Sequence, residues 1–189
     1  IQNGPNIFQI TGAPHRITQD RLAKARLEWR ERLMHLPSPR IALIVGGSTK
    51  RRTFTKQMAS ELGAAASKMA TVAGGSLMVT TSRRSNESVG ALINEIKAPA
   101  EIFKWGDEGE NPYLGFLAMA EGVIVTGDSV SMCSEAAATP GPVWIYAPKK
   151  LTIHKHGMLH QQLVEDGYAK FFDVNGGTTF EEWTHPPLN

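Results

Sequence analysis

Residues 41–49 have the sequence Ile41-Ala42-Leu43-Ile44-Val45-Gly46-Gly47-Ser48-Thr49. The first five form a continuous apolar run without polar alternation, which is typical of a strand buried on both faces of a parallel sheet. Two glycines and two hydroxyl residues follow directly and indicate a tight turn at the end of that strand. The first expectation is therefore a parallel α/β sheet.

The same kind of pattern recurs along the chain at the spacing of βαβ units. Further strands are predicted at 76–81, 102–105, 122–126 and 142–147, with a short one within 167–172. Apolar residues at helical spacing predict helices over 54–69, 86–96, 112–120, 129–138 and 154–164. Strands that alternate with helices predict right-handed crossovers, and hence an α/β fold with a Rossmann-like, doubly wound parallel sheet.

An amphipathic helix precedes the first strand. Its apolar positions Leu22, Ala25, Trp29, Leu33 and Leu36 recur at spacings of three and four among charged residues. Thr18 or Asp20 is the predicted N-cap, and Pro37 and Pro39 end the helix. We expect residues 1–38 to be a linker segment and helix, residues 39–189 to be the Rossmann-like domain, and the chain to be a piece of a longer protein.

Composition excludes several classes of protein. The chain has 189 residues, of which 41% are hydrophobic and 20% charged, so it is no disordered tail, coiled-coil rod or disulfide scaffold. Its single cysteine, Cys133, excludes a zinc site of paired cysteines and fits a reducing compartment, so we expect a cytoplasmic protein. No apolar run approaches the roughly 20 residues of a membrane helix, and no signal peptide is visible.

Charge is distributed unevenly. Residues 1–60 carry eleven Lys and Arg against three Asp and Glu, whereas residues 61–189 carry nine against fifteen. A basic first third is suited to nucleic acid, anionic lipid or phosphorylated ligands, and equally to a solvated helix face beside another domain.

Two loops at the predicted carboxyl edge of the sheet suit an anion. Ligands of open parallel sheets bind beyond the carboxyl ends of the strands. The first loop brings backbone N–H groups to a helix start and adds positive charge; its candidate site residues are Gly46, Gly47, Ser48 and Thr49, followed by Lys50, Arg51 and Arg52. The second offers a hydroxyl and two guanidinium groups, at Ser82, Arg83 and Arg84. The first loop matches neither a P-loop nor the dinucleotide fingerprint, and a capped turn alone would also explain it.

The densest polar cluster follows the strand 122–126. Its candidate site residues are Asp128, Ser129, Ser131, Met132 and Glu135. Ser129 and Ser131 are expected to offer hydroxyls and helix N–H groups to a diphosphate, and Glu135, on the same helix face as Ser131, to accept hydrogen bonds from a sugar or ribose. Capping alone explains Asp128 and Ser129 but not Ser131, Ser134 and Glu135 on a helix expected to be buried.

Three alternatives remain for the other polar and aromatic residues. Gly127-Asp128-Ser129 resembles a Gly-Asp-Ser nucleophile turn, for which His154, His156 or His160 would be the base, although the last glycine of GxSxG is missing. His156 and His160 lie four apart, but no HExxH or neighbouring carboxylate accompanies them, so no metal site is predicted. Trp105 and Tyr113 are expected in the core rather than in a wall that stacks on a base.

Several segments resemble a known family. PRIALIVGGSTK (39–50), SLMVTTSRR (76–84), NPYLGFLAMAEGVIVTGDSVSMCSEAA (111–137) and GAPHR (12–16) are similar to bacterial relatives of the plant "elongated mitochondria" proteins of mitochondrial fission, a family also labelled nucleoside-diphosphate-sugar epimerase-like. The resemblance covers most of residues 4–189. One departure is Thr139-Pro140-Gly141-Pro142, where relatives have Thr-Gly-Lys-Pro, and the missing lysine weakens a phosphate role for that turn.

The resemblance implies a donor site, because the family in turn is similar to GT-B glycosyltransferases, which hold their ligand between two Rossmann-like halves. On that likeness this chain is the C-terminal, donor-binding half, and the N-terminal half is missing. The 46–49 turn and residues 129–131 would hold the donor's phosphates, Arg83 and Arg84 would line the cleft, Glu135 would hold the ribose, and the 105–113 loop would face the base.

Three functions follow as expectations. The first is a glycosyltransferase that uses a nucleotide-diphosphate-sugar as donor ligand, with no cofactor and no metal, an acceptor site in the missing half and His15 as a candidate near the cleft. The second is a non-catalytic adaptor, the known role of the plant members, which binds a protein or the surface of a membrane. The third is a serine hydrolase on Ser129. Nucleic acid is not an expected partner.

Overall fold

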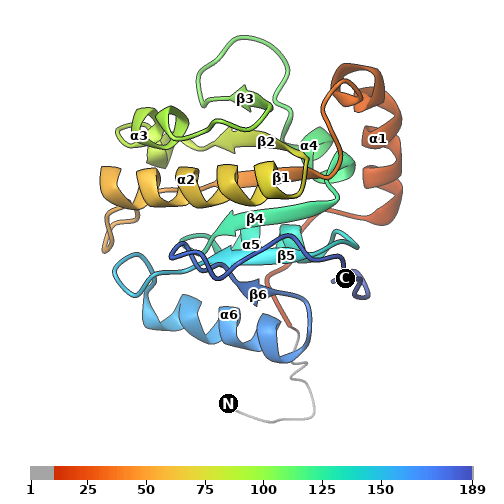
Figure 1. Ribbon diagram of the computed structural model, residues 1–189. Coiled ribbons are helices and arrows are strands. Elements are labelled where there is room, and N and C mark those ends of the chain that lie inside the picture. Colours follow the sequence, from red (N-terminus) through yellow and green to blue (C-terminus); the bar gives the residue numbers. More distant parts are fainter. Residues whose placement is uncertain (1–10, 189) are drawn as a thin grey trace, which may run out of the picture.

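The sheet is Rossmann-like, as the sequence predicts. A computed structural model describes residues 11–188, so the first ten residues of the predicted 1–38 segment, and Asn189, lie outside the described residues. Six parallel strands have the order β3-β2-β1-β4-β5-β6, the order of a doubly wound sheet (Figure 1). They are β1 (Arg40–Val45), β2 (Ser76–Thr81), β3 (Ala100–Phe103), β4 (Gly122–Thr126), β5 (Val143–Tyr146) and β6 (Lys170–Phe171).

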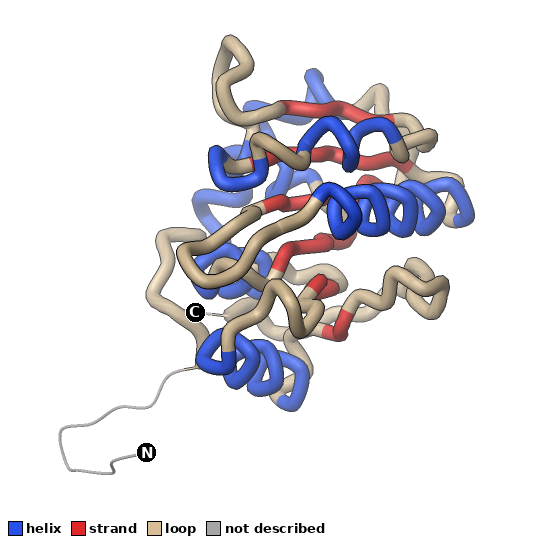
Figure 2. Tube along the Cα trace, turned by 90° about the vertical axis from the view of Figure 1, so that its left-hand side faces the viewer, coloured by secondary structure: helices blue, strands red, loops and turns tan. Residues whose placement is uncertain are grey.

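Helices cover both faces of this sheet. Those on one face are α2 (Lys56–Val72) and α3 (Val89–Asn94), and those on the other are α1 (Gln19–Leu33), α4 (Tyr113–Met119), α5 (Val130–Ala137) and α6 (His154–Glu165). Figure 2 looks onto the edge at which the strands end, with α2 on the right of the sheet and the helices of the opposite face on the left. Of the two predicted candidates, Thr18 and not Asp20 is the N-cap of α1, and its hydroxyl accepts from Arg21 N at 3.3 Å.

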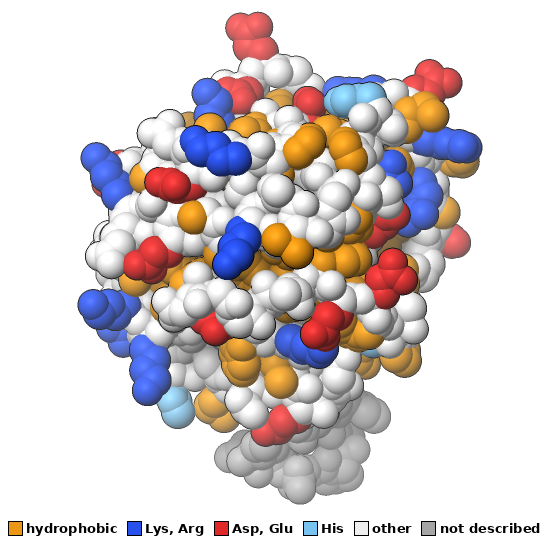
Figure 3. Space-filling view, in the orientation of Figure 1, with side chains coloured by type: hydrophobic (Ala, Val, Ile, Leu, Met, Phe, Trp, Pro, Cys, Tyr) orange, Lys and Arg blue, Asp and Glu red, His pale blue; other side chains and the backbone are white. Residues whose placement is uncertain are grey.

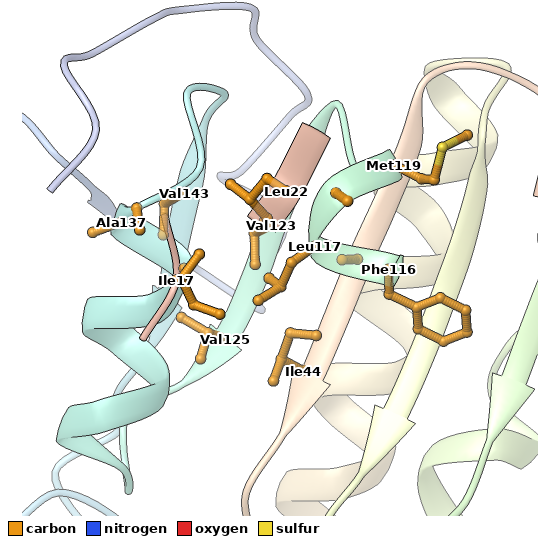
Figure 4. Close-up of a cluster of buried hydrophobic side chains, with 14 of the residues drawn as sticks. Ile17, Leu22, Ile44, Phe116, Leu117, Met119, Val123, Val125, Ala137 and Val143 are labelled. Carbon is orange, nitrogen blue, oxygen red and sulfur yellow. The ribbon is translucent and has the colours of Figure 1, made fainter. Parts of the chain in front are cut away.

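Continuous burial explains why β1 is a central strand. Its side chains alternate between two cores: Ile41, Leu43 and Val45 face α2, whereas Ala42 and Ile44 face α4 and α5. Both cores exclude water from the central strands, which makes an uninterrupted apolar run the stable choice. Figure 4 shows the second core, where Ile44, Val123 and Val125 of the sheet meet Phe116 and Leu117 of α4.

Several boundaries differ from the prediction: helix α1 ends at Leu33 rather than 36, and helix α2 covers 56–72 rather than 54–69. Strand β3 starts at Ala100 rather than 102 and ends at Phe103, because Trp105 N donates outside the ladder, to Thr81 Oγ1 at 3.0 Å. Helix α3 ends at Asn94 rather than 96. A 3-10 turn, Arg83–Ser85, was not expected; the Ser82 hydroxyl caps it by accepting from Arg84 N at 3.1 Å.

Helix α1 is packed into the second core. Its buried residues Leu22, Ala25, Trp29 and Leu33 lie against α4, and the rings of Trp29 and Phe116 meet edge to face at 6.4 Å. The division at residue 38 into linker and domain stays a prediction. Within residues 11–188, no helix is both long enough and apolar enough to cross a membrane.

Candidate functional site

The candidate site lies where the chain changes direction across the sheet. From β1 the strand order runs to β2 and β3, and the chain then returns to β4 on the other side of β1. In doubly wound sheets this reversal opens a crevice at the carboxyl ends of the strands. Here the loop after β1 and the β4–α5 turn, 127–129, lie in contact at this position, and we use the name crevice for the surface that they form with the loop after β2. Figure 2 faces this edge.

Two glycines allow the β1 loop to lie close to its neighbours. A Cβ at Gly46 would collide with the Asp128 carboxylate, and Gly46 N donates to Thr126 Oγ1 at 2.7 Å. Gly47 has φ +120°, a conformation that favours glycine, and lies against the backbone of Arg84. Ser48 N then donates to Arg84 O at 2.9 Å. Loops after three neighbouring strands are thus joined at the crevice.

An ion pair spans this junction. Arg84 Nη1 lies 2.6 Å from Asp128 Oδ2, and the Asp128 side chain is fully buried while about a third of the Arg84 side chain is exposed. The other carboxylate oxygen, Asp128 Oδ1, is buried and has no hydrogen-bond partner among residues 11–188. Part of the positive charge that was predicted for a ligand is therefore balanced by a protein carboxylate, and Asp128 and Arg84 fix the separation of the two loops.

Four further cations at this edge are exposed. Lys50, Arg51 and Arg52 follow the β1 turn, Arg83 follows β2, and none of them forms an ion pair with another residue of the described chain. Arg83 and Arg84 line a hollow of about 300 Å³ together with Ser48, Asn86, Glu87 and Ser88. The crevice is therefore bordered by free positive charge on the β1 and β2 side.

The predicted hydroxyls hold the turns in place. Ser48 Oγ accepts from Phe54 N at 2.9 Å, and Thr49 Oγ1 accepts from Arg52 N at 3.1 Å. Ser82 is fully used, because its hydroxyl accepts from Arg84 N and also donates to Gly46 O. Ser129 Oγ accepts from Met132 N at 3.4 Å as the N-cap of α5. An accepting hydroxyl keeps its hydrogen, so three of the four can still donate to a ligand.

Helix α5 presents its N-terminus to the crevice, but the burial predicted for its polar residues is partly wrong. Ser131 is exposed in the first turn, and Met132 is half-buried. Ser134 is buried, but its hydroxyl has structural partners: it accepts from Ala13 N at 2.8 Å and donates to Val130 O at 3.0 Å. The N–H groups of the first helical turn lack intrahelical acceptors by geometry, which leaves donors beside exposed Ser131.

Glu135 is paired with a residue that the sequence did not connect to it. The Tyr113 hydroxyl, at the start of α4, donates to Glu135 Oε2. Burial raises the pKa of Tyr113 far above its usual value, and the neighbouring carboxylate raises it further, so the phenol stays protonated and donates. One Glu135 oxygen is therefore engaged, and Oε1 is the atom that remains for a ligand.

The aromatic prediction is wrong for Trp105. This residue is 53% exposed after β3 rather than buried in the core. Tyr113 is half-buried and turned to Glu135. The two therefore do not form one stacking wall, and only Trp105 offers a free ring surface.

The histidines do not assemble the predicted hydrolase. Within residues 11–188, the Ser129 hydroxyl has no hydrogen bond to any histidine. His160 is buried on α6 against Gly127, and neither of its ring nitrogens has a partner of hydrogen-bond geometry among these residues. Burial lowers the pKa of His160 to about 4; His156 adds to the decrease and the Gly127 backbone offsets part of it. The serine hydrolase stays an unsupported prediction.

Metal ligands do not converge in this part of the chain. Among residues 11–188, no group of three His, Cys, Asp or Glu side chains is arranged to hold a metal ion. His154 is exposed and His156 half-buried on α6. His15 is half-buried, in the segment that leads to α1, with an unpartnered Nδ1.

Sequence reasoning missed two pairings at the site, Arg84–Asp128 and Tyr113–Glu135. Both join residues that lie far apart in the chain, and no local spacing predicts them. A signal was available for the first pairing. Asp128 is an acidic residue in the turn after β4, and the strand order places that turn near the cations that follow β1 and β2, which include Arg84.

Two solved structures are similar to part of this fold. MurG of Acinetobacter baumannii matches with a TM-score of 0.49 and 20% sequence identity, over 92% of this chain and 46% of that one. The MAR1 ribonuclease of Caenorhabditis elegans matches with a TM-score of 0.45 and 12% identity, over 74% and 79%.

Sequence relatives establish the family. An uncharacterised protein of Rickettsia prowazekii is 33% identical over this whole chain, and the mitochondrial fission protein ELM1 of Arabidopsis thaliana is 30% identical over 97% of it. The chain spans about half the length of these curated relatives, 53% of the first and 43% of the second. The model of the family described as "Mitochondrial fission ELM1" matches residues 1–189. This chain therefore belongs to the mitochondrial fission ELM1 family.

Proposed function

We propose that the carboxyl edge of the sheet binds the diphosphate of a nucleotide-linked sugar, and that the chain is the donor-binding half of a GT-B-type glycosyltransferase. One observation carries the proposal: the N-terminus of α5, the Gly46-Gly47 turn and four unpaired exposed cations lie at the same edge, at the reversal of strand order. Helix N-termini and arginines are the groups that proteins use to hold phosphates.

Each part of the crevice has a distinct role in this proposal. The first-turn N–H groups of α5 and the free hydrogen of the Ser129 hydroxyl donate to phosphate oxygens, while Arg83 neutralises charge from the β2 side. Glu135 Oε1 accepts from a ribose or sugar hydroxyl, with the carboxylate oriented by Tyr113. Trp105 offers a ring surface to the base.

Such a site favours departure of the nucleotide. In a glycosyl transfer the bond between the sugar and the diphosphate breaks, and negative charge grows on the phosphate oxygen that leaves. Fixed N–H dipoles and guanidinium groups stabilise that charge because they are already oriented before the reaction. The acceptor and any general base would come from the other half of the longer protein.

The test is a thermal-shift panel of nucleotides and nucleotide-sugars on this chain, with two variants. Ser131→Glu places a carboxylate in the first turn of α5, where it favours the helix dipole but repels a phosphate. Arg83→Gln removes an exposed cation from the 300 Å³ hollow. A ligand at 100 times its dissociation constant adds about 2.7 kcal/mol, a shift of several degrees at this size. We expect one diphosphate nucleotide to produce that shift and both variants to lose it.

The matched control is Lys97→Gln, which removes a cation just after the carboxyl end of α3, where Lys97 Nζ donates to Asn94 O. It should bind like the wild type. If the thermal shift is unchanged in Ser131→Glu, the ligand does not bind at the N-terminus of α5. No shift with any nucleotide, in this chain and in a version that includes the other half, would contradict the donor site.

A second candidate function has its own observation. The non-catalytic adaptor predicted from the sequence requires a surface for a partner, and the outer side of α1 exposes large apolar side chains beside arginines. Such a surface does not exclude a donor site.

A further inference from the structure

One side of α1 carries an exposed strip of alternating apolar and cationic residues. Leu27 is 76% exposed and Met34 58% exposed, although both are large hydrophobic residues. Arg26 and Arg30 are exposed beside them, at helical spacings of three and four, and Ala23 continues the same side one turn earlier. We name these five residues the α1 strip, and we propose that it docks on an anionic lipid surface.

The charge of the strip is not satisfied within the described protein. Two other cations of α1 have acidic partners: Lys24 pairs with Glu28, and Arg32 pairs with Glu110 at 3.0 Å while its guanidinium covers the Trp29 ring. A third, Arg21, donates to the backbone, at Arg16 O. Arg26 and Arg30 form no ion pair within residues 11–188. Two free guanidinium groups that flank Leu27 therefore complement negative charge on whatever covers this side.

A shallow groove adjoins the strip. It has a volume of about 210 Å³ between α1 and α4, and Leu22, Leu117, Ala118 and Pro140 form its apolar part while Arg26 lies at its rim. An apolar floor with a cation at the edge suits a lipid, whose phosphate meets the guanidinium while the first carbons of its chain enter the groove.

The pattern fits an interface rather than a membrane span. Leu27 and Met34 project outward, away from the face of α1 that packs on α4, and arginine stems reach past them to the headgroups. Glu31 and Asp20 are also exposed on the outward side of α1, so the positive side of the helix is narrow and the predicted attachment is reversible. In Figure 3, Lys and Arg lie beside hydrophobic side chains, with acidic ones among them, at the upper right, where Figure 1 places α1.

The strip is distant from the donor site. Helix α1 ends shortly before β1 begins, and Gln19 Nε2 donates to Ala138 O at the end of α5. The start of β1 and the end of α5 both lie at the amino edge of the sheet, opposite to the crevice (Figure 1). The docking proposal therefore does not depend on the proposed glycosyl transfer, and the nucleotide panel and the lipid experiment can fail separately.

The experiment is co-flotation of the chain with vesicles of phosphatidylglycerol and phosphatidylcholine, compared with phosphatidylcholine alone. We expect binding to the anionic vesicles only, reduced by salt. R26Q/R30Q should lower the partition coefficient about 30-fold, since each arginine near such a surface contributes about a factor of five. L27E/M34E should lower it about tenfold or more, because two apolar side chains no longer enter the interface.

The control is Val72→Glu, which adds one carboxylate, against two in L27E/M34E, at an apolar residue that is 70% exposed at the end of α2. It should bind like the wild type, and melting curves should show that every variant is folded. Equal binding to neutral vesicles, wild-type binding by either double variant, or no binding at all would overturn the proposal. If the chain ignores vesicles but both double variants lose a cross-link to another protein, the strip is a protein interface instead.

Discussion

At the residue scale, His160 is unusual because its neutral form is enforced by its surroundings. The ring lies under the β4–α5 turn, against Gly127, and both nitrogens are buried. Burial lowers the pKa of His160 from 6.5 to about 4. Between these two pH values the unfolded chain binds a proton at this position and the folded chain does not. Protonation therefore favours unfolding as the pH falls.

We therefore predict that protonation of His160 does not reduce the free energy of unfolding above pH 6.5, and that this free energy decreases as the pH falls from 6.5 toward 4. The share that belongs to His160 is about 3 kcal/mol in total, from about 1.4 kcal/mol per pH unit. His160→Gln should remove this share of the slope, as measured by urea unfolding at a series of pH values. His35→Gln, which changes an exposed histidine, should leave the slope unchanged. A wild-type slope in His160→Gln would contradict the assignment.

Polar residues at the site show how far single positions can be predicted. Gly46, Ser129 and the cations after β1 and β2 were found from their place after apolar strands, because a turn and a helix start have local signatures. The pairings of Asp128 and Glu135 were not found, because each depends on a side chain from another βα unit. Ser131 was expected in a buried environment, but it lies on the exposed side of the first turn of α5.

At the element scale, helices α1 and α4 approach closely at Gly115. A Cβ at this position would collide with the Trp29 ring, so glycine sets the separation of the two helices. Gly115→Ala should destabilise the protein by about 1–3 kcal/mol in urea unfolding, through overpacking, despite the better helix propensity of alanine. Gly90→Ala in α3 is the control, because nothing lies within 4 Å of its added methyl group. We expect it to be neutral or to stabilise by about 0.5–1 kcal/mol. Equal effects of the two substitutions would show that the close contact carries no energy.

The regular elements were predictable for a physical reason. Strands β1, β2, β4 and β5 are buried on both faces, so each has at its centre an uninterrupted run of apolar residues that the sequence displays directly. Strand β3 borders the sheet, and none of its residues is fully buried. A partly exposed strand such as β3 has a mixed pattern, and its predicted bounds were shifted by two residues. The 3-10 turn after β2 depends on the Ser82 hydroxyl and had no periodic signal.

At the scale of the whole molecule, the question is whether residues 1–38 are a linker or part of one folding unit. Four side chains of α1 are buried in the core shared with α4, and Trp29 is almost completely enclosed. Without α1, Phe116 and Leu117 would lose part of their cover and face water. This arrangement favours a single cooperative unit over an independent domain that begins at residue 39.

A chain that consists of residues 39–189 should therefore lose the cooperative unfolding transition and bind a hydrophobic dye, as a partly packed state does. Trp29→Ala in the full chain should cost about 3–5 kcal/mol by removing the largest of the four buried side chains. Leu27→Ala, at the exposed side of the same helix, should change stability by less than about 0.5 kcal/mol. If the shortened chain unfolds cooperatively at the midpoint of the full chain, residues 39–189 form the independent domain that the sequence suggested, and α1 is only its linker. If the shortened chain instead loses its cooperative transition and Trp29→Ala is strongly destabilised, α1 is part of the folding unit, because its buried side chains complete the core that it shares with α4.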